Sequence, residues 1–244
     1  MSRLSYFLCS FFIIIFTSCA FSQSDEQVIT KFVNKQKEIA DKSKIKTLYQ
    51  EFKVSMMGME IPNKIWMKGD NIRFETSFMG QNQTFIVTKD AGWQIQNGTT
   101  TDLPTEQLEG IKKQIINQTL AGSINFNDEE LGREKNKYEL LGLEKINNLS
   151  CHKLKITPKD TTETGNEGTF WFDTKDFLIR KISFKEKSMG QEQNIDILVK
   201  DYQQVGGFTF PKVVEMNVGE GQDVKIEFNT VKVNEPIDDS LFKK

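Results

Sequence analysis

The period of the hydrophobic positions changes near Lys46, and this change separates a helix from a series of strands. In residues 25–41, apolar side chains recur every three or four positions with Lys and Glu between them, which predicts an amphipathic helix. Between residues 47 and 96 the period becomes two, and turns containing Gly divide the segment. This part of the chain therefore predicts a meander of four or five strands.

A second helix is predicted near Pro104, because Pro is favoured at the first helical position. Leu108, Ile111 and Ile115 give this segment one apolar stripe. Gly110 lies inside it and weakens a helix by about 1 kcal/mol relative to Ala. Residues 121–136 are polar and interrupted by Gly, so we interpret them as a loop.

The second half of the chain carries strand patterns throughout, followed by a short helical turn at residues 238–242. The predicted strands lie near residues 137–146, 150–157, 168–174, 177–187, 193–203, 207–218 and 223–234. Short connections make successive strands antiparallel neighbours, and a sheet of about eleven strands must curl. The predicted fold class is mainly β with helices (α+β), with the apolar helix stripes on the concave face.

Several segments, taken in order, resemble the outer-membrane lipoprotein-sorting proteins of the LolA/LolB-like superfamily. They are IWMKGDNIRF (Ile65–Phe74), TFIVTKDAGWQI (Thr84–Ile95), WFDTKDFLIRKISF (Trp171–Phe184), DYQQVGGFTFP (Asp201–Pro211) and NEPIDDSLF (Asn234–Phe242). The resemblance covers most of residues 45–242. It implies an unclosed, strongly bent antiparallel half-barrel with a helical lid, which binds acyl chains of lipoproteins. The chain departs from the family where Lys68-Gly69 replaces a Lys/Arg-Pro step. The resemblance therefore predicts the fold but not the specific cargo.

The first residues have the order of a secretory signal. One charge, Arg3, precedes an apolar run, and small residues follow it. The run is shorter than the roughly 20 residues that span a bilayer. We predict that residues 1–22 are a signal peptide and that residues 23–244 form a single LolA-like domain in the periplasm.

A second processing site competes with cleavage after Ser22. The stretch FTSC, which ends at Cys19, resembles a bacterial lipobox and would give a lipid-modified cysteine and a membrane-anchored lipoprotein. The usual lipobox has Leu where this chain has Phe16, so we favour plain cleavage. Both alternatives place the protein outside the cytoplasm.

Charge and cysteine content exclude several classes of protein. The net charge of −2 gives no electrostatic footprint for nucleic acid, so none is expected as a partner. Plain cleavage leaves Cys151 as the single cysteine, so the domain, which we expect to be a monomer, is held by its core alone. The only histidine, His152, is adjacent to Cys151 on a strand, where neighbours point to opposite faces. We therefore expect no enzyme activity, no metal and no cofactor; an envelope hydrolase is the least favoured alternative.

Five of the eight methionines lie between Met56 and Met79. Methionine adapts to irregular space, so these residues suit either a core or a surface that meets variable acyl chains. Met57 and Met79 have the opposite parity to the inward residues of their strands, so they must face elsewhere or lie at a bulge. We predict an apolar cavity lined by Phe52, Val54, Met56, Ile65, Met67, Ile72, Phe74, Phe78 and Trp93, with Leu108, Ile111 and Ile115 as the inner face of the lid.

Arg73 matches by position a family arginine that holds the lid closed, which would make it a latch. The alternative is a solvated surface role, because Arg73 points opposite Ile72 and Phe74 on its strand. At the level of function, we expect a periplasmic carrier of acyl chains of lipoproteins, or of other lipid. The alternative is an exported sensing module on the same fold, with a self-filled cavity and an envelope protein as its partner.

Overall fold

The computed structural model describes residues 24–41, 43–118, 131–160, 167–188, 191–217 and 223–244. The predicted signal peptide, with Cys19, lies outside the described residues. Most of the loop predicted at residues 121–136 also lies outside them.

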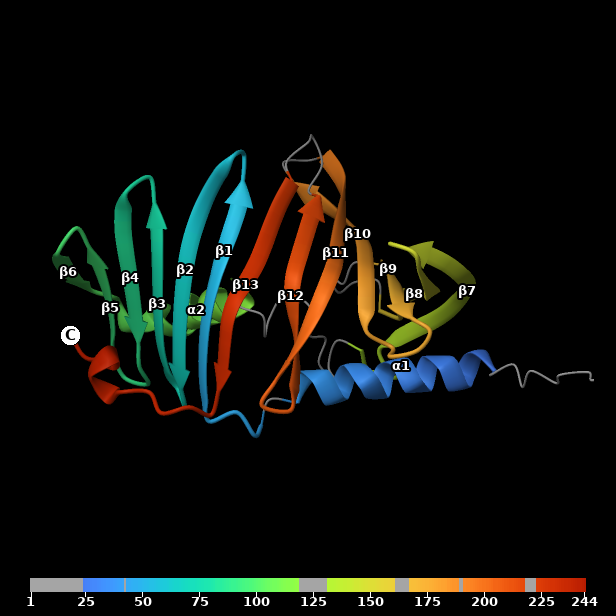
Figure 1. Ribbon diagram of the computed structural model, residues 1–244, viewed down its shortest axis with the longest axis horizontal. Helices are drawn as coiled ribbons and strands as arrows, with labels where there is room; N and C mark the ends of the chain where they lie inside the picture. The colour runs from blue at the N-terminus through green and yellow to red at the C-terminus, as the bar shows by residue number, and fades with distance from the viewer. Residues whose placement is uncertain (1–23, 42, 119–130, 161–166, 189–190, 218–222) are drawn as a thin grey trace, which may run out of the picture.

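The strands form one antiparallel sheet made of two meanders. The first comprises β1 (Thr47–Met56), β2 (Met59–Lys68), β3 (Asn71–Phe78), β4 (Gln81–Val87), β5 (Gly92–Gln96) and β6 (Thr99–Asp102). The second comprises β7 (Asn136–Ile146), β8 (Leu149–Pro158), β9 (Gly168–Asp173), β10 (Ile179–Ser188), β11 (Gln191–Val205), β12 (Phe208–Asn217) and β13 (Asp223–Val233). Pairing of β1 with β13 joins the meanders, and the sheet ends at β6 and β7 without closing. The predicted fold class, an unclosed and curled antiparallel sheet with few helices, is confirmed (Figure 1).

In the described residues the sheet has 13 strands, where the sequence predicts a first meander of up to five strands and seven strands after it. The strand without a prediction is β6, whose four residues, TTTD, are all exposed. A strand with no buried face has no alternation of apolar and polar residues, so its period cannot be read from the sequence.

Helix α1 (Asp25–Ala40) covers the half of the sheet that contains β8 to β12 (Figure 1). Ser24 and Gln27 form a capping box at its start, which satisfies two backbone N–H groups. Phe32 is fully buried and stacks on Phe172, with ring centroids 4.3 Å apart. The predicted helix over residues 25–41 is confirmed, and its apolar stripe forms the core of this half.

Helix α2 (Leu108–Gln118) follows a 3-10 turn, η1 (Thr105–Gln107), and covers the other half of the same face (Figure 1). Leu108 and Ile115 are buried against inward residues of β1, β2 and β3. The chain closes with the predicted helical turn, η2 (Asp239–Phe242). Each half of the concave face therefore has its own helix and its own core.

Candidate functional site

A small apolar pocket opens on the concave face, where the linker between α1 and β1 passes the ends of β1 and β2. Its volume is about 210 Å³. It is lined by Ile45, Lys46, Thr47, Leu48, Met67, Gly69 and Phe210. Leu48 and Met67 face each other across β1 and β2, and Leu48 and Phe210 are buried members of the α2 core. Lys46 is exposed, so an apolar interior lies next to one cation.

Most of the predicted lining residues pack inside the concave face. Phe52, Ile65, Ile72 and Phe74 are buried in the core under α2. Val54 is partly buried and packs against the same core, and Met67 lines the pocket.

The other inward residues of these strands lie near the strand ends. Met56 is half-buried at the end of β1, and Phe78 is 41% exposed at the end of β3. Met57 and Met79 occupy two-residue hairpin turns, are mainly exposed, and have positive φ angles. Met67 is therefore the methionine of this cluster that the structure places in the pocket.

Trp93 does not lie on the concave face, and its predicted place in the cavity is wrong. The register pairs Arg73 with Ile86, and Ile86 with Trp93, so these side chains share one face of the sheet. That face is the convex one, because Arg73 alternates with the core residues Ile72 and Phe74. The physical reason is a second covering: the C-terminal segment lies over this part of the convex face and buries Phe242.

Arg73 holds that C-terminal segment. Its Nη1 donates to the carbonyl oxygen of Leu241 at 3.1 Å, and its Nε donates to Glu75 at 2.7 Å. Its guanidinium carbon lies 5.9 Å from the ring centroid of Trp66. Among the described residues, these contacts involve η2 and not α2. The lid latch is thus unsupported by the contacts of Arg73, which fixes the C-terminus instead.

The predicted lid residues do face the sheet. Leu108 and Ile115 are buried and Ile111 is partly buried, and all three pack into the apolar core of this half. By contrast, α1 also has a polar attachment, because Nε2 of its buried Gln36 donates to the carbonyl oxygen of Phe177 at 3.0 Å. The contacts of these three α2 side chains with the sheet are apolar.

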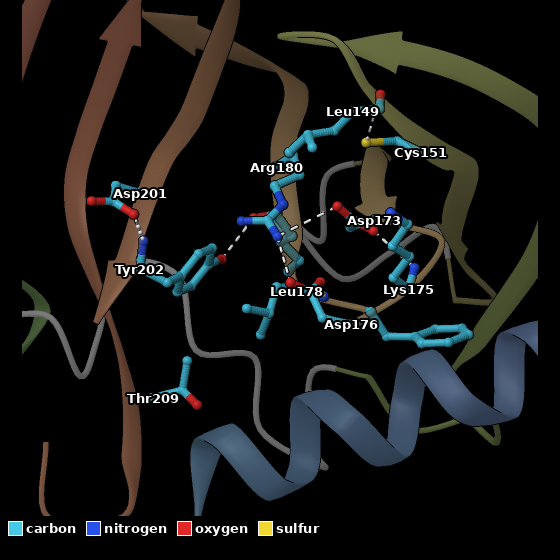
Figure 2. Close-up of polar contacts among 12 residues, drawn as sticks. Leu149, Cys151, Asp173, Lys175, Asp176, Leu178, Arg180, Asp201, Tyr202 and Thr209 are labelled. Carbon is cyan, nitrogen blue, oxygen red and sulfur yellow. Dashed lines mark hydrogen bonds and ion pairs between the residues drawn. The ribbon is translucent and has the colours of Figure 1, made fainter. Parts of the chain in front are cut away.

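A partly buried polar cluster in the β9–β10 turn has no counterpart in the sequence-based predictions (Figure 2). Arg180 forms ion pairs with Asp173 at 3.5 Å and Asp176 at 2.5 Å. Its guanidinium lies 5.3 Å from the ring centroid of Tyr202, whose hydroxyl donates to the carbonyl oxygen of Ile179 at 2.6 Å. Burial raises the pKa of Tyr202 well above its usual value, so the phenol stays protonated.

This cluster fixes the turn that holds α1. The register shifts at Arg180 in β10 and again in β11 before Tyr202, and such bulges re-aim side chains. Phe177, in the same turn, accepts the hydrogen bond of Gln36 from α1. In sequence, the charges of DTKDFLIR were the available indication, but a solvated turn has the same composition.

Cys151 and His152 lie on opposite faces of β8, as predicted. The His152 ring packs at a tilt against the Phe172 ring, with ring centroids 5.2 Å apart, and burial lowers the pKa of His152. Cys151 is fully buried beside Asp173, and burial raises the pKa of its thiol. In the described ranges, no three His, Cys, Asp or Glu side chains are grouped as a metal site would require. Within that same part of the chain, no helix has the length and apolar character needed to cross a membrane.

Comparison with known proteins identifies one family and a set of similar folds. A family model described as "uncharacterized protein"-like matches residues 105–244. No curated protein matches the sequence. Three solved structures are similar over nearly the whole chain, at identities that show the fold alone.

A DUF1329 family protein from Desulfovibrio piger is 14% identical, with a TM-score of 0.53 over 91% of this chain and 98% of that one. A LolA superfamily protein from Nitrosomonas europaea is 15% identical, with a TM-score of 0.50 over 88% and 97%. A domain from Vibrio parahaemolyticus assigned to outer membrane lipoprotein sorting is 14% identical, with a TM-score of 0.51 over 87% and 95%. The predicted resemblance to the LolA-like superfamily is confirmed in the fold.

Proposed function

The chain belongs to the "uncharacterized protein"-like family whose model matches residues 105–244, and from this premise and its LolA-like fold we propose that it is an envelope carrier of acyl chains. One observation carries the proposal: the apolar pocket between Leu48, Met67 and Phe210. Burial of an acyl chain there contributes about 0.8 kcal/mol for each methylene that leaves water. The pocket holds part of a chain, and movement of α2 would admit the rest.

The proposal includes the protein's location and form. Residues 1–22 are an export signal, and residues 23–244 act as one monomeric domain in the periplasm. Modification of Cys19 would instead anchor the protein to a membrane, where it would receive cargo and not shuttle it. The proposed role is non-covalent binding, with no catalytic residue and no cofactor. Three solved structures with this fold carry the names of protein families or of lipoprotein sorting, and none of the three is named for an enzyme activity. This likeness of fold supports a binding role.

A matched pair of methionine variants tests the pocket. Met67 lines it, whereas Met79 is 77% exposed in a hairpin turn. Met67→Gln places an amide in the apolar lining and should weaken binding of a fluorescent fatty-acid analogue by about tenfold or more, since an unpaired buried amide is unfavourable by about 1–3 kcal/mol. Met79→Gln should leave the affinity unchanged. Equal affinities in the two variants would contradict the proposed site.

A second candidate function, an exported sensing module, is favoured by how much of the concave face is filled by the protein's own side chains. Phe52, Ile65 and Phe74 are all buried under α2. The convex face also offers a recess of about 270 Å³ beside Tyr49 and Trp66. A pulldown from envelope extract separates the two functions. A stoichiometric protein partner that is lost in a Trp66→Ala variant, with no bound lipid, would favour sensing.

A further inference from the structure

A fully buried glutamine lies in the middle of the concave face. Gln50 of β1 has 0% exposure, and it shares its face with the core residues Leu48 and Phe52. Its cross-strand neighbours are Ile65 in β2 and Val231 in β13, and both are buried and apolar. Among the described residues, neither Nε2 nor Oε1 of Gln50 has a hydrogen-bond partner. An amide with two unpaired polar ends is rare in a protein core.

Gln50 is one inward step from the pocket. The pocket is lined by the facing pair Leu48 and Met67, and the next inward pair along these two strands is Gln50 and Ile65. Asn63, a buried polar residue, is the diagonal neighbour of Gln50, and its Nδ2 donates to the carbonyl oxygen of Ile61 at 2.8 Å. Beyond the apolar pair Leu48 and Met67, the inward positions of β1 and β2 therefore include two buried amides, Gln50 and Asn63.

We propose that Gln50 is the polar anchor of a lipid-binding site, and that the ligand is a single-chain lipid with a neutral hydrogen-bonding group. This inference rests on the proposed function and adds the chemistry of the cargo. The amide offers a donor and an acceptor, so it best matches a group that also has both, such as a hydroxyl or an amide. A charged head group fits less well, because a carboxylate buried among apolar side chains needs a cation or several hydrogen bonds. Entry of the neutral group would satisfy the amide that the ligand-free protein leaves unpaired.

The test compares two probes of equal chain length, 1-decanol and decane. Their affinities are measured by displacement of an apolar fluorescent dye, with protein refolded from urea to remove bound lipid. In the Gln50→Leu variant, the ratio of decanol affinity to decane affinity should fall by about tenfold, the value of one hydrogen bond. Val231→Ile, a conservative change at the cross-strand neighbour of Gln50 in β13, is the control and should keep the wild-type ratio. Gln50→Met is the second variant in case Gln50→Leu does not fold.

The ligand-free variants give an independent measurement. Removal of an unpaired buried amide should raise the melting temperature of Gln50→Leu and Gln50→Met by a few degrees. Wild-type affinity ratios in both variants would overturn the role of Gln50 while the pocket itself stands. Lowered melting temperatures in both would overturn the claim that the amide is unpaired. Failure of both probes to displace the dye from the wild-type protein would instead remove the proposed lipid-binding function, and this inference with it.

Discussion

The side chain of Leu108, at the start of α2, occupies the space beside Gly92 that any larger residue would need. A Cβ placed on Gly92 would lie 2.5 Å from Cδ2 of Leu108. It would also lie 3.3 Å from the carbonyl oxygen of Ile86, so the backbone of β5 has little room to retreat. The glycine thus lets the proposed lid sit directly on the sheet.

Gly92→Ala should displace the start of α2 and destabilise the protein by about 1–3 kcal/mol, because the added methyl group forces Leu108 out of its packed position. Urea unfolding measures the change. Gly110→Ala is the matched control, since a Cβ at Gly110, within α2, meets nothing within 4 Å. It should stabilise the helix by up to about 1 kcal/mol. Changes of the same sign in the two variants would contradict this account of α2.

The ion pairs of Arg180 should make this residue sensitive to truncation. Arg180→Ala leaves the carboxylate of Asp173, whose side chain is 7% exposed, without its cation. Loss of one partner from a buried pair destabilises by about 3–5 kcal/mol. The double variant Arg180→Met with Asp173→Asn removes both charges and should recover much of that loss in a urea titration. A double variant that is no more stable than Arg180→Ala would argue against an uncompensated charge as the cause.

His152 should make the stability depend on pH on the acidic side of neutrality. Burial lowers its pKa below the usual 6.5, so below pH 6.5 the unfolded chain binds more protons than the folded one. The contribution of neutral His152 is therefore complete above pH 6.5 and is lost as the pH falls. Between pH 7.5 and pH 5, the unfolding free energy of the wild type should therefore fall relative to that of His152→Phe, which has no imidazole to protonate. Because the chain has one histidine, NMR can measure its pKa directly, and a value of 6.5 or higher would exclude this explanation.

Two hairpin turns hold methionine where the backbone favours other residues. Met57 has a φ of 51° and precedes Gly58 at 76°, the pattern of a turn that usually begins with Asn. The side chain of Met57 is mainly exposed, so its replacement forfeits little packing. Met57→Asn should stabilise the protein by up to about 1 kcal/mol, as a rise in melting temperature. The reverse change, Asn97→Met in the equivalent β5–β6 turn, should lower the melting temperature. Unchanged melting temperatures in both variants would show that these turns are unstrained.

The sequence predicts most of this fold because helix and strand periods alternate clearly and the turns contain Gly or Asn. It predicts the site less well, for reasons visible in single residues. Trp93 follows the apolar parity of β5, but that parity points to a convex face covered by a distant segment, the C-terminus. Gln50 has the parity of the core, yet a polar residue at one inward position gives no sign of whether it finds a partner. Such features depend on which distant segments meet, and a local pattern does not contain that information.

The most direct test of the proposed carrier function is the mass of the protein as the cell exports it. The full chain would be produced with its signal, purified gently from the envelope, and weighed by native and then denaturing mass spectrometry. The account predicts a native mass above that of residues 23–244 by the mass of a lipid, which is lost on denaturation. A bare chain in both measurements would contradict the carrier function and favour the sensing module. A covalent adduct at Cys19 would contradict the soluble form and make the protein an anchored lipoprotein.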